Sequence, residues 1–151
     1  MEFFGLVWPG KEAARAAAST PLPRHFTRDS ALSTAVGADN AIIAADNLPV
    51  LQELASRGEL FDVIYIDPPY NTGKDFVYCD NYRLRRQMRS GSYAEWHSQW
   101  LSMMLPRLIL ARQVLSTNGF IFVSIGEDEV ANTRKVLDEV FGEECFAGQL
   151  I

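Results

Sequence analysis

The chain has 151 residues, of which 48% are hydrophobic and 22% charged, a composition typical of a globular domain with one buried core. No apolar run reaches the roughly 18 to 20 residues that cross a bilayer. The N-terminus also lacks the succession of basic, apolar and small residues that is typical of a signal peptide, so we expect a cytoplasmic protein without a membrane span. The net charge of -5 gives no overall attraction to phosphate, so binding of nucleic acid would have to rest on local basic patches and a pocket for a base.

The N-terminal residues 1–38 are rich in Ala, Pro, Ser and Thr. A turn signal at Trp8-Pro9-Gly10-Lys11 and a break at Pro21-Leu22-Pro23 enclose an Ala-rich stretch, and a short helix is predicted over about 11–18. We therefore expect residues 1–38 to form an arm laid over a core that residues 39–151 build.

From Ala41 onward, short apolar stretches alternate with longer amphipathic ones. This alternation predicts an α/β fold with crossover units on a parallel sheet and helices on both faces. A first strand is predicted over Ala41–Ala45, and a helix is predicted from Leu48 to Gly58. The next strand, Phe61–Ile66, is almost continuously apolar, which is typical of a central strand covered on both faces.

The second half of the chain begins with a long excursion, residues 71–92, which has no apolar periodicity and carries a run of arginines. The elements predicted after it are a helix over Tyr93–Leu115 closed by Asn118-Gly119, a strand over Phe120–Ile125, a helix over Glu129–Phe141 and a further strand entered at Cys145–Ile151. The long helix carries a stripe of Trp96, Trp100, Met103, Met104, Leu108 and Ala111. Its spacing favours core packing over a stacking platform for nucleotides.

Neither cysteines nor histidines indicate a metal site. Cys79 and Cys145 lie far apart and outside any CxxC or Cys/His cluster, so two free thiols are predicted. His25 and His97 have no partners at ligand spacing, and we expect them at the surface or in local hydrogen bonds.

The strongest chemical signal lies where the strand Phe61–Ile66 ends. The residues that follow it are Asp67, Pro68, Pro69 and Tyr70. Ligands of open α/β sheets bind at the carboxyl ends of strands, and prolines there remove backbone donors while keeping carbonyl acceptors. The Asp67 carboxylate and the Pro68 carbonyl could hold both hydrogens of an exocyclic amine, and Tyr70 could stack on the base that carries it.

These residues resemble the catalytic motif of the amino-methylating DNA methyltransferases of the beta group, and the likeness extends over nearly the whole chain to methylation subunits of type III restriction-modification systems. The stretches that carry the resemblance are Trp8-Pro9-Gly10-Lys11, Ala45-Asp46-Asn47-Leu48, Asp67-Pro68-Pro69-Tyr70, Asn71-Thr72-Gly73, Asp75-Phe76 and the run from Gly119 to Glu129. The resemblance implies a Rossmann-like methyltransferase fold, here incomplete. It also implies transfer of a methyl group from S-adenosylmethionine to adenine in DNA, with Asp67, Pro68, Pro69 and Tyr70 as catalytic residues.

The resemblance further suggests which residues contact the methyl donor. Asp46, with Asn47 and Leu48, would bind S-adenosylmethionine, although Ala45 stands where the family pattern usually has glycine. Asp46 and Asn47 are equally good residues for the N-cap of the following helix, and the two roles can coexist.

Contacts to DNA are expected from the segment after the motif. The candidate substrate-binding residues are Asn71, Lys74, Phe76, Arg85 and Arg86, within a basic run that also includes Arg83 and Arg89. A charge run on a loop is more often only solvated, and Phe76 could equally anchor the loop to the core.

The glycine-rich cofactor loop and the target recognition region that follow the motif in this family are not found, so residues 39–151 are interpreted as a partial catalytic domain and the chain as a fragment that is inactive alone. Expected partners are double-stranded DNA with a flipped adenine, a second methylation subunit and a restriction subunit. Three alternatives stay open: methylation of the cytosine amino group, where Ser is more usual than Asp67, a non-catalytic assembly domain, and a disrupted gene product.

Overall fold

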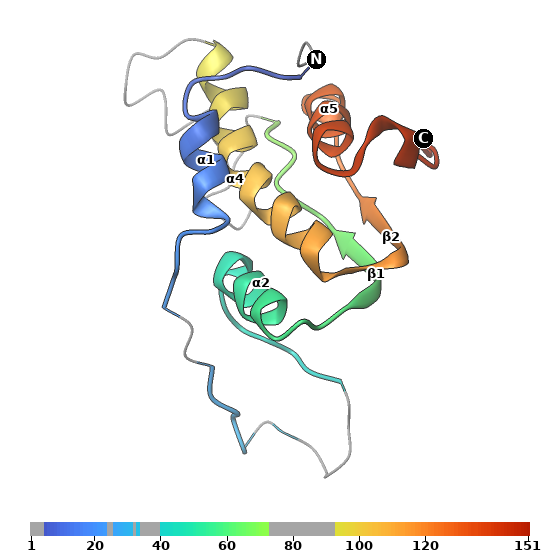
Figure 1. Cartoon of the computed structure of the whole chain (residues 1–151). Coiled ribbons are helices and arrows are strands. Elements are labelled where there is room, and N and C mark those ends of the chain that lie inside the picture. The colour runs from blue at the N-terminus through green and yellow to red at the C-terminus, as the bar shows by residue number, and fades with distance from the viewer. Residues whose placement is uncertain (1–4, 24–25, 32, 34–39, 73–92) are drawn as a thin grey trace.

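The computed structural model describes residues 5–23, 26–31, 33, 40–72 and 93–151 (Figure 1). In chain order the elements are the helices α1 (Lys11–Ala17) and α2 (Asn47–Ser56), the strand β1 (Phe61–Ile66), the helix α4 (Tyr93–Val114), the strand β2 (Leu115–Val123), the helix α5 (Val130–Phe141) and the short 3-10 helix η1 (Glu143–Cys145). The α/β class predicted from the alternation is confirmed in coarse form, as a small parallel sheet with helices.

β1 and β2 are parallel neighbours joined by a crossover through α4. Val63 aligns with Phe120 and Ile66 with Val123. β2 already begins at Leu115, so the prediction of a strand starting at Phe120 was wrong at that end. Leu115 pairs with Phe61, and the register then shifts before Val63 pairs with Phe120. A Cβ at Gly119 would lie 3.0 Å from the Asp62 carbonyl oxygen, so the close approach needs glycine there.

The two faces of this sheet differ sharply. Ile66 and Ile121 pack against the buried core, whereas Val63, Tyr65 and Phe122, on the opposite face, are exposed, Tyr65 to 66%, as the alternation of side chains along a strand requires. The expectation that helices cover β1 on both faces is therefore wrong for the described part of the chain, because the core helices pack on one face only.

α4 is the central helix of the core. Its residues Trp100, Leu105 and Leu108 are almost completely buried, and they pack with Val136 of α5 and Trp8 at the entrance to α1. Core packing of the apolar stripe is confirmed for Trp100, Met104, Leu108 and Ala111. Burial of each large apolar side chain contributes about 1.5 to 3 kcal/mol.

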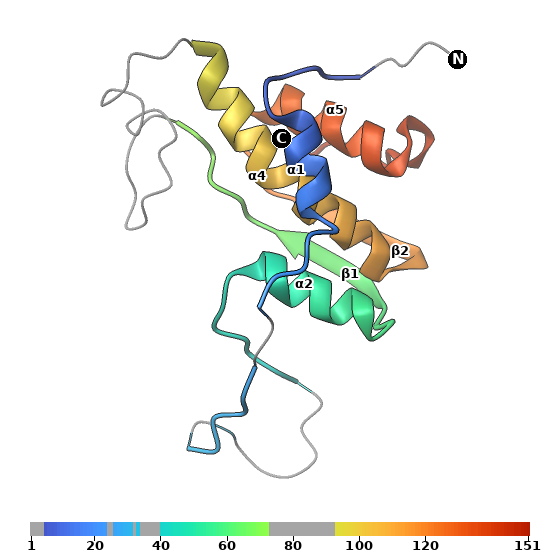
Figure 2. The ribbon, with the colours of Figure 1, turned by 60° about the vertical axis from the view of Figure 1, so that its left-hand side comes forward.

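The helix predicted over about 11–18 is confirmed as α1, which lies along α4 (Figures 1 and 2). Three polar contacts hold it there. The Trp8 indole donates to the Ser102 hydroxyl at 2.9 Å, and Lys11 Nζ lies 2.8 Å from the Glu139 carboxylate of α5, which also binds Arg15. The N-terminal segment is therefore attached to both α4 and α5.

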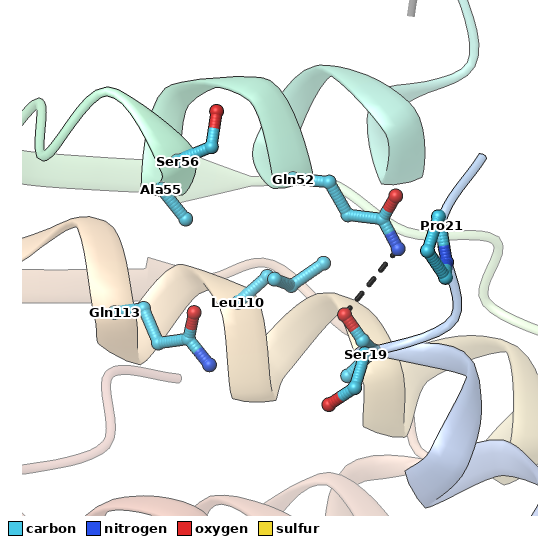
Figure 3. A pocket seen from close by; sticks show the side chains of 8 residues that line it. Ser19, Pro21, Gln52, Ala55, Ser56, Leu110 and Gln113 are labelled. Atoms are coloured by element: carbon cyan, nitrogen blue, oxygen red, sulfur yellow. Dashed lines mark hydrogen bonds between the residues drawn. The ribbon is translucent and has the colours of Figure 1, made fainter. Parts of the chain in front are cut away.

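Gln52 of α2 fixes the chain where it leaves α1 (Figure 3). Its amide nitrogen donates to the carbonyls of Ala17, Ala18 and Thr20, and its oxygen accepts from the Leu22 amide. A pocket of about 270 Å³ opens beside it, lined by Ala18, Ser19, Pro21, Gln52, Ala55, Ser56, Leu110 and Gln113. The polar groups of Gln52 are used within the chain, so this pocket is a structural junction between α1, α2 and α4.

Two predicted strands do not form. Residues 41–45 have no regular structure and are exposed, and 146–151 follow η1 without forming a strand, with Leu150 and Ile151 exposed. Both stretches are apolar, but neither has a neighbouring strand among the described residues, and strand structure requires such a partner for its hydrogen bonds. In the described ranges, none of the helices combines the length and the apolar character of a membrane span.

Candidate active site

The segment Asp67–Tyr70 leaves β1 at its carboxyl end, next to the carboxyl end of β2. The Ser124 amide donates to the Ile66 carbonyl at 3.0 Å, which extends the pairing to the last residue of β1. Asp67 is exposed, and the two prolines and Tyr70 are half-buried. The Pro69 carbonyl accepts a hydrogen bond of 2.7 Å from the Trp100 indole of α4. The core helix α4 thus holds the turn through the Pro69 carbonyl, while Asp67 is exposed to solvent.

Tyr70 lies beside both the Asp67 carboxylate and the end of β2. Hydrogen bonding to Asp67, partial burial and the negative charge of Asp67 raise the pKa of Tyr70 above its ordinary value of 10.0, and a hydrogen bond to Ser124 opposes this rise. The segment after β2 supports the ring, since a Cβ added at Gly126 would be 3.4 Å from Tyr70 Cδ2. The phenol is therefore neutral, and its ring lies against a backbone surface.

Asn71 ends the turn in a buried position. Its backbone has φ 58°, a left-handed conformation that Asn and Asp tolerate better than other side chains. Its amide nitrogen donates to Glu129 Oε1 at 2.5 Å. The side chain points to the protein interior, so a role for Asn71 in substrate binding stays a prediction.

Asp46 and Asn47, the predicted cofactor contacts, lie at the start of α2. Asp46 accepts from the Leu48 amide at 2.8 Å, which confirms its role as the N-cap of α2. Arg107 of α4 binds the carboxylate of Asp46 at 3.1 Å and the side-chain oxygen of Asn47 at 2.6 Å. Because α2 and β1 run in opposite directions (Figure 2), this helix start lies toward the end of the sheet that carries Asp67.

The predicted DNA contacts Lys74, Phe76, Arg85 and Arg86, together with Arg83 and Arg89, lie outside the described residues, so these expectations stay untested. Among the described residues, no group of three or more His, Cys, Asp or Glu side chains could hold a metal ion. The described part of the candidate site thus consists of the turn after β1, the segment after β2 and the start of α2.

Sequence reasoning missed several residues that hold this site. Trp100 was assigned to the core for its apolar surface, without its hydrogen bond to the turn. Glu129 was interpreted as the start of a helix and as the end of the family-like run, without a contact to the turn. His97, which lies 2.8 Å from the Glu129 carboxylate, was interpreted as a residue without a partner at ligand spacing. Contacts between positions 32 or 58 residues apart leave no local pattern. The one available signal was the run from Gly119 to Glu129, which resembles the family.

Comparison with known proteins agrees with this geometry. Residues 61–151 match the DNA methylase family, and the chain belongs to that family. Its relatives include the Mod subunit of the type III restriction-modification enzyme StyLTI of Salmonella typhimurium, 36% identical over 97% of this chain and 25% of the relative. Another is the EcoP15I Mod subunit of Escherichia coli, 34% identical over 99% of this chain and 27% of the relative.

A type II enzyme is related as well. The methyltransferase M.KpnI of Klebsiella pneumoniae is 37% identical over 80% of this chain and 28% of its own length. The resemblance to type III methylation subunits seen in the sequence is thereby confirmed. The chain spans about a quarter of the length of these curated relatives.

Proposed function

We propose that this chain is the catalytic portion of a DNA adenine methyltransferase of a restriction-modification system, which transfers a methyl group from S-adenosylmethionine to the exocyclic amino group of adenine. The observation that carries the proposal is the rigid turn Asp67–Tyr70 at the carboxyl end of β1, in a chain of the DNA methylase family. Such an edge is where open α/β sheets bind their ligands.

The side chains of this turn suit an amine that must act as a nucleophile. The Asp67 carboxylate and the Pro68 carbonyl would accept its two hydrogens, which directs the nitrogen lone pair away from the turn and raises its electron density. Tyr70, half-exposed and supported by Gly126, would stack on a base rotated out of the duplex. Base stacking of this kind is worth about 1 to 3 kcal/mol.

Part of a site for the methyl donor fits the described residues. The start of α2 presents the exposed carboxylate of Asp46 with Asn47 and Leu48, and a carboxylate there can accept a hydrogen bond from an adenine amino group. When bound, S-adenosylmethionine supplies an electrophilic methyl group. Arg107 would keep the Asp46 carboxylate oriented for this contact.

The partners that we propose follow from the relatives' names. The relatives are Mod subunits of restriction-modification enzymes, so we infer a double-stranded DNA substrate with one adenine flipped out. A second methylation subunit and a restriction subunit would complete the assembly. The arginine-rich segment that includes Arg85 and Arg86 would contact DNA phosphates.

Two alternatives are set against this proposal. A cytosine amino group would fit the same acceptors, but Asp67 stands where enzymes acting on cytosine more often have serine. An assembly role without catalysis is favoured by the apolar sheet face with Val63, Tyr65, Phe120 and Phe122 exposed, because such a face commonly marks a contact with another protein segment.

The experiment is a calorimetric titration of the purified chain with S-adenosylmethionine, run beside a methyl-transfer assay on adenine-containing DNA. Loss of transfer in Asp67→Ala with donor binding kept would support the assignment of Asp67. A folded chain that neither binds the donor nor transfers methyl would leave assembly as the better explanation. Comparison of adenine-only with cytosine-only target DNA decides between the two bases.

A further inference from the structure

The carboxylate of Glu129 lies in an unusual place for a charged group. Glu129 is 0% exposed, although Glu is rarely fully buried unless it is paired. It accepts hydrogen bonds from Asn71 Nδ2 at 2.5 Å, Asn132 Nδ2 at 2.7 Å and His97 Nδ1 at 2.8 Å. Because a carboxylate only accepts, Nδ1 is the protonated nitrogen of His97 in this arrangement. Donors from the turn after β1, from α4 and from α5 thus converge on one group.

Helix capping does not explain this carboxylate. Glu129 is at the N-cap of α5, but its side chain makes no capping hydrogen bond, whereas a residue at this position commonly accepts from a free amide of the first turn. The side chain is instead directed to Asn71, 58 positions earlier in the chain. The Glu129 side chain therefore links the segment after β2 to the turn after β1.

Asn71 transmits this contact to the turn. It follows Tyr70 directly, is 3% exposed and has a left-handed backbone, so fixing its side chain fixes the direction in which the chain leaves Tyr70. The other anchor is the hydrogen bond from Trp100 to the Pro69 carbonyl. Gly126, three residues before Glu129, lies against the ring of Tyr70. The turn is thus held at its middle by α4 and at its end by Glu129.

We propose that Glu129 is a positioning residue for methyl transfer: through Asn71 it holds Asp67 and Tyr70 at the place where the base is received. This inference rests on the proposed function, since the placement matters for catalysis only if the turn receives a base. Acceptors that must meet an amine tolerate little displacement, and an error of about 1 Å can cost on the order of a hundredfold in rate.

A reciprocal exchange of donor and acceptor tests the contact directly. Glu129→Gln leaves a single acceptor oxygen for the three donors Asn71, Asn132 and His97, and Asn71→Asp turns the donor into an acceptor. Each single variant disturbs the pair, and Asn71→Asp alone sets two carboxylates against each other. The double variant restores the hydrogen bond with its direction reversed. Asp tolerates the left-handed backbone of position 71, and His97 can accept from the amide that replaces the carboxylate by changing its tautomer.

The readout on the chain itself is the pKa of Tyr70, followed by tyrosinate absorbance with Tyr70→Phe as the reference. We expect each single variant to bring this pKa back toward its ordinary value, because the turn loosens and Asp67 moves away from the phenol, and the double variant to restore the raised value. An unchanged pKa in both single variants, or no recovery in the double variant, overturns the proposal. Should a single variant not fold, a folded double variant with the raised pKa supports it.

Val136→Ala is the matched control, since Val136 is buried on α5 within the core cluster that contains Trp100 and Leu108. It should lower stability and leave the Tyr70 pKa unchanged; a shift as large as in Glu129→Gln would mean that any loosening of α5 moves the turn, and would overturn a specific role for Glu129. In the methyl-transfer assay, Glu129→Gln should lower kcat roughly ten- to hundredfold with little change in KM for DNA. If the folded wild-type chain neither binds S-adenosylmethionine nor transfers methyl, the proposed function fails, while the Tyr70 titration still decides whether Glu129 holds the turn.

Discussion

The indole nitrogen of Trp100 donates a hydrogen bond of 2.7 Å to the carbonyl oxygen of Pro69. This bond joins the middle of the core helix α4 to the one segment of the chain in which two consecutive residues have no backbone N–H to give to the sheet. This hydrogen bond therefore contributes both to the stability of the fold and to the geometry of the candidate site.

Trp100→Phe is expected to keep most of the buried aromatic surface and to lose this hydrogen bond. The Pro69 carbonyl then lacks its donor in a partly buried place, which costs about 1 to 3 kcal/mol in free energy of unfolding. Urea denaturation measures this loss. Methyl transfer should fall further than the loss of folded protein explains, since the turn is less firmly held.

Trp8→Phe serves as the comparison for that variant. Trp8 also donates its indole hydrogen, to Ser102 at 2.9 Å, but on the side of α4 that contacts α1. A similar loss of stability without an effect on Tyr70 titration is expected. Trp100→Phe, in contrast, should change the pKa of Tyr70. Equal changes of this pKa in both variants would argue that Trp100 acts only through the core.

The titration of Tyr70 reports directly on Asp67. Asp67→Asn removes the carboxylate that raises the pKa of Tyr70, so this pKa should fall toward 10.0. Because the folded-state value is higher than the unfolded one, the associated stabilisation is present below about pH 10 and is lost as the pH rises through the folded-state value. Tyrosinate absorbance measures the shift, and a pKa that does not move in Asp67→Asn would contradict the contact.

Glu139 is a nearly buried charge that joins α5 to α1, so its removal should be costly. Its side chain is only 6% exposed and pairs with Lys11 and Arg15 of α1. Glu139→Gln leaves Lys11 with an uncompensated charge in a mostly buried site, and a loss of about 3 kcal/mol is expected. In Glu53→Gln, which breaks the exposed pair with Arg57, about 0.5 kcal/mol is expected. Denaturant titration of both variants checks the ratio, and similar losses would refute the argument.

The two roles of Asp46 can be separated by two substitutions. Asp46→Asn keeps an oxygen to cap α2, so stability should change little, whereas Asp46→Ala loses the cap at a cost of about 1 kcal/mol. If Asp46 also binds the methyl donor through its charge, Asp46→Asn weakens donor binding in calorimetry while the unfolding midpoint stays near that of the wild type. Normal donor binding by Asp46→Asn would leave Asp46 with the cap alone.

Much of the local structure could be predicted from the sequence. The short apolar, β-branched run of β1 and the helical spacing of the stripe on α4 indicate the type of each element, and Asp46 is a residue type that favours an N-cap. The start of β2 was misplaced because Asn118-Gly119 usually ends a helix, whereas here Gly119 allows the close approach of Asp62 within the strand.

What could not be predicted depends on pairing between distant segments. Residues 41–45 are as apolar as a buried strand, but strand formation depends on a neighbour, which the local sequence does not report. The motif Asp67–Tyr70 was found because its residue types are distinctive. Its anchors Glu129 and Trp100 were not, since a glutamate before a helix and a tryptophan on a core stripe are common features with many possible partners.

The separation of Asn71 from Glu129 affects how the candidate site forms while the protein is synthesised on the ribosome. The two residues are 58 positions apart, and synthesis at about 5 to 20 residues per second places roughly 3 to 12 seconds between them. During that interval the nascent chain carries the turn without the carboxylate that holds it, and β1 without the strand beside it. The order of translation therefore keeps the candidate site unformed until the residue that precedes α5 has been made.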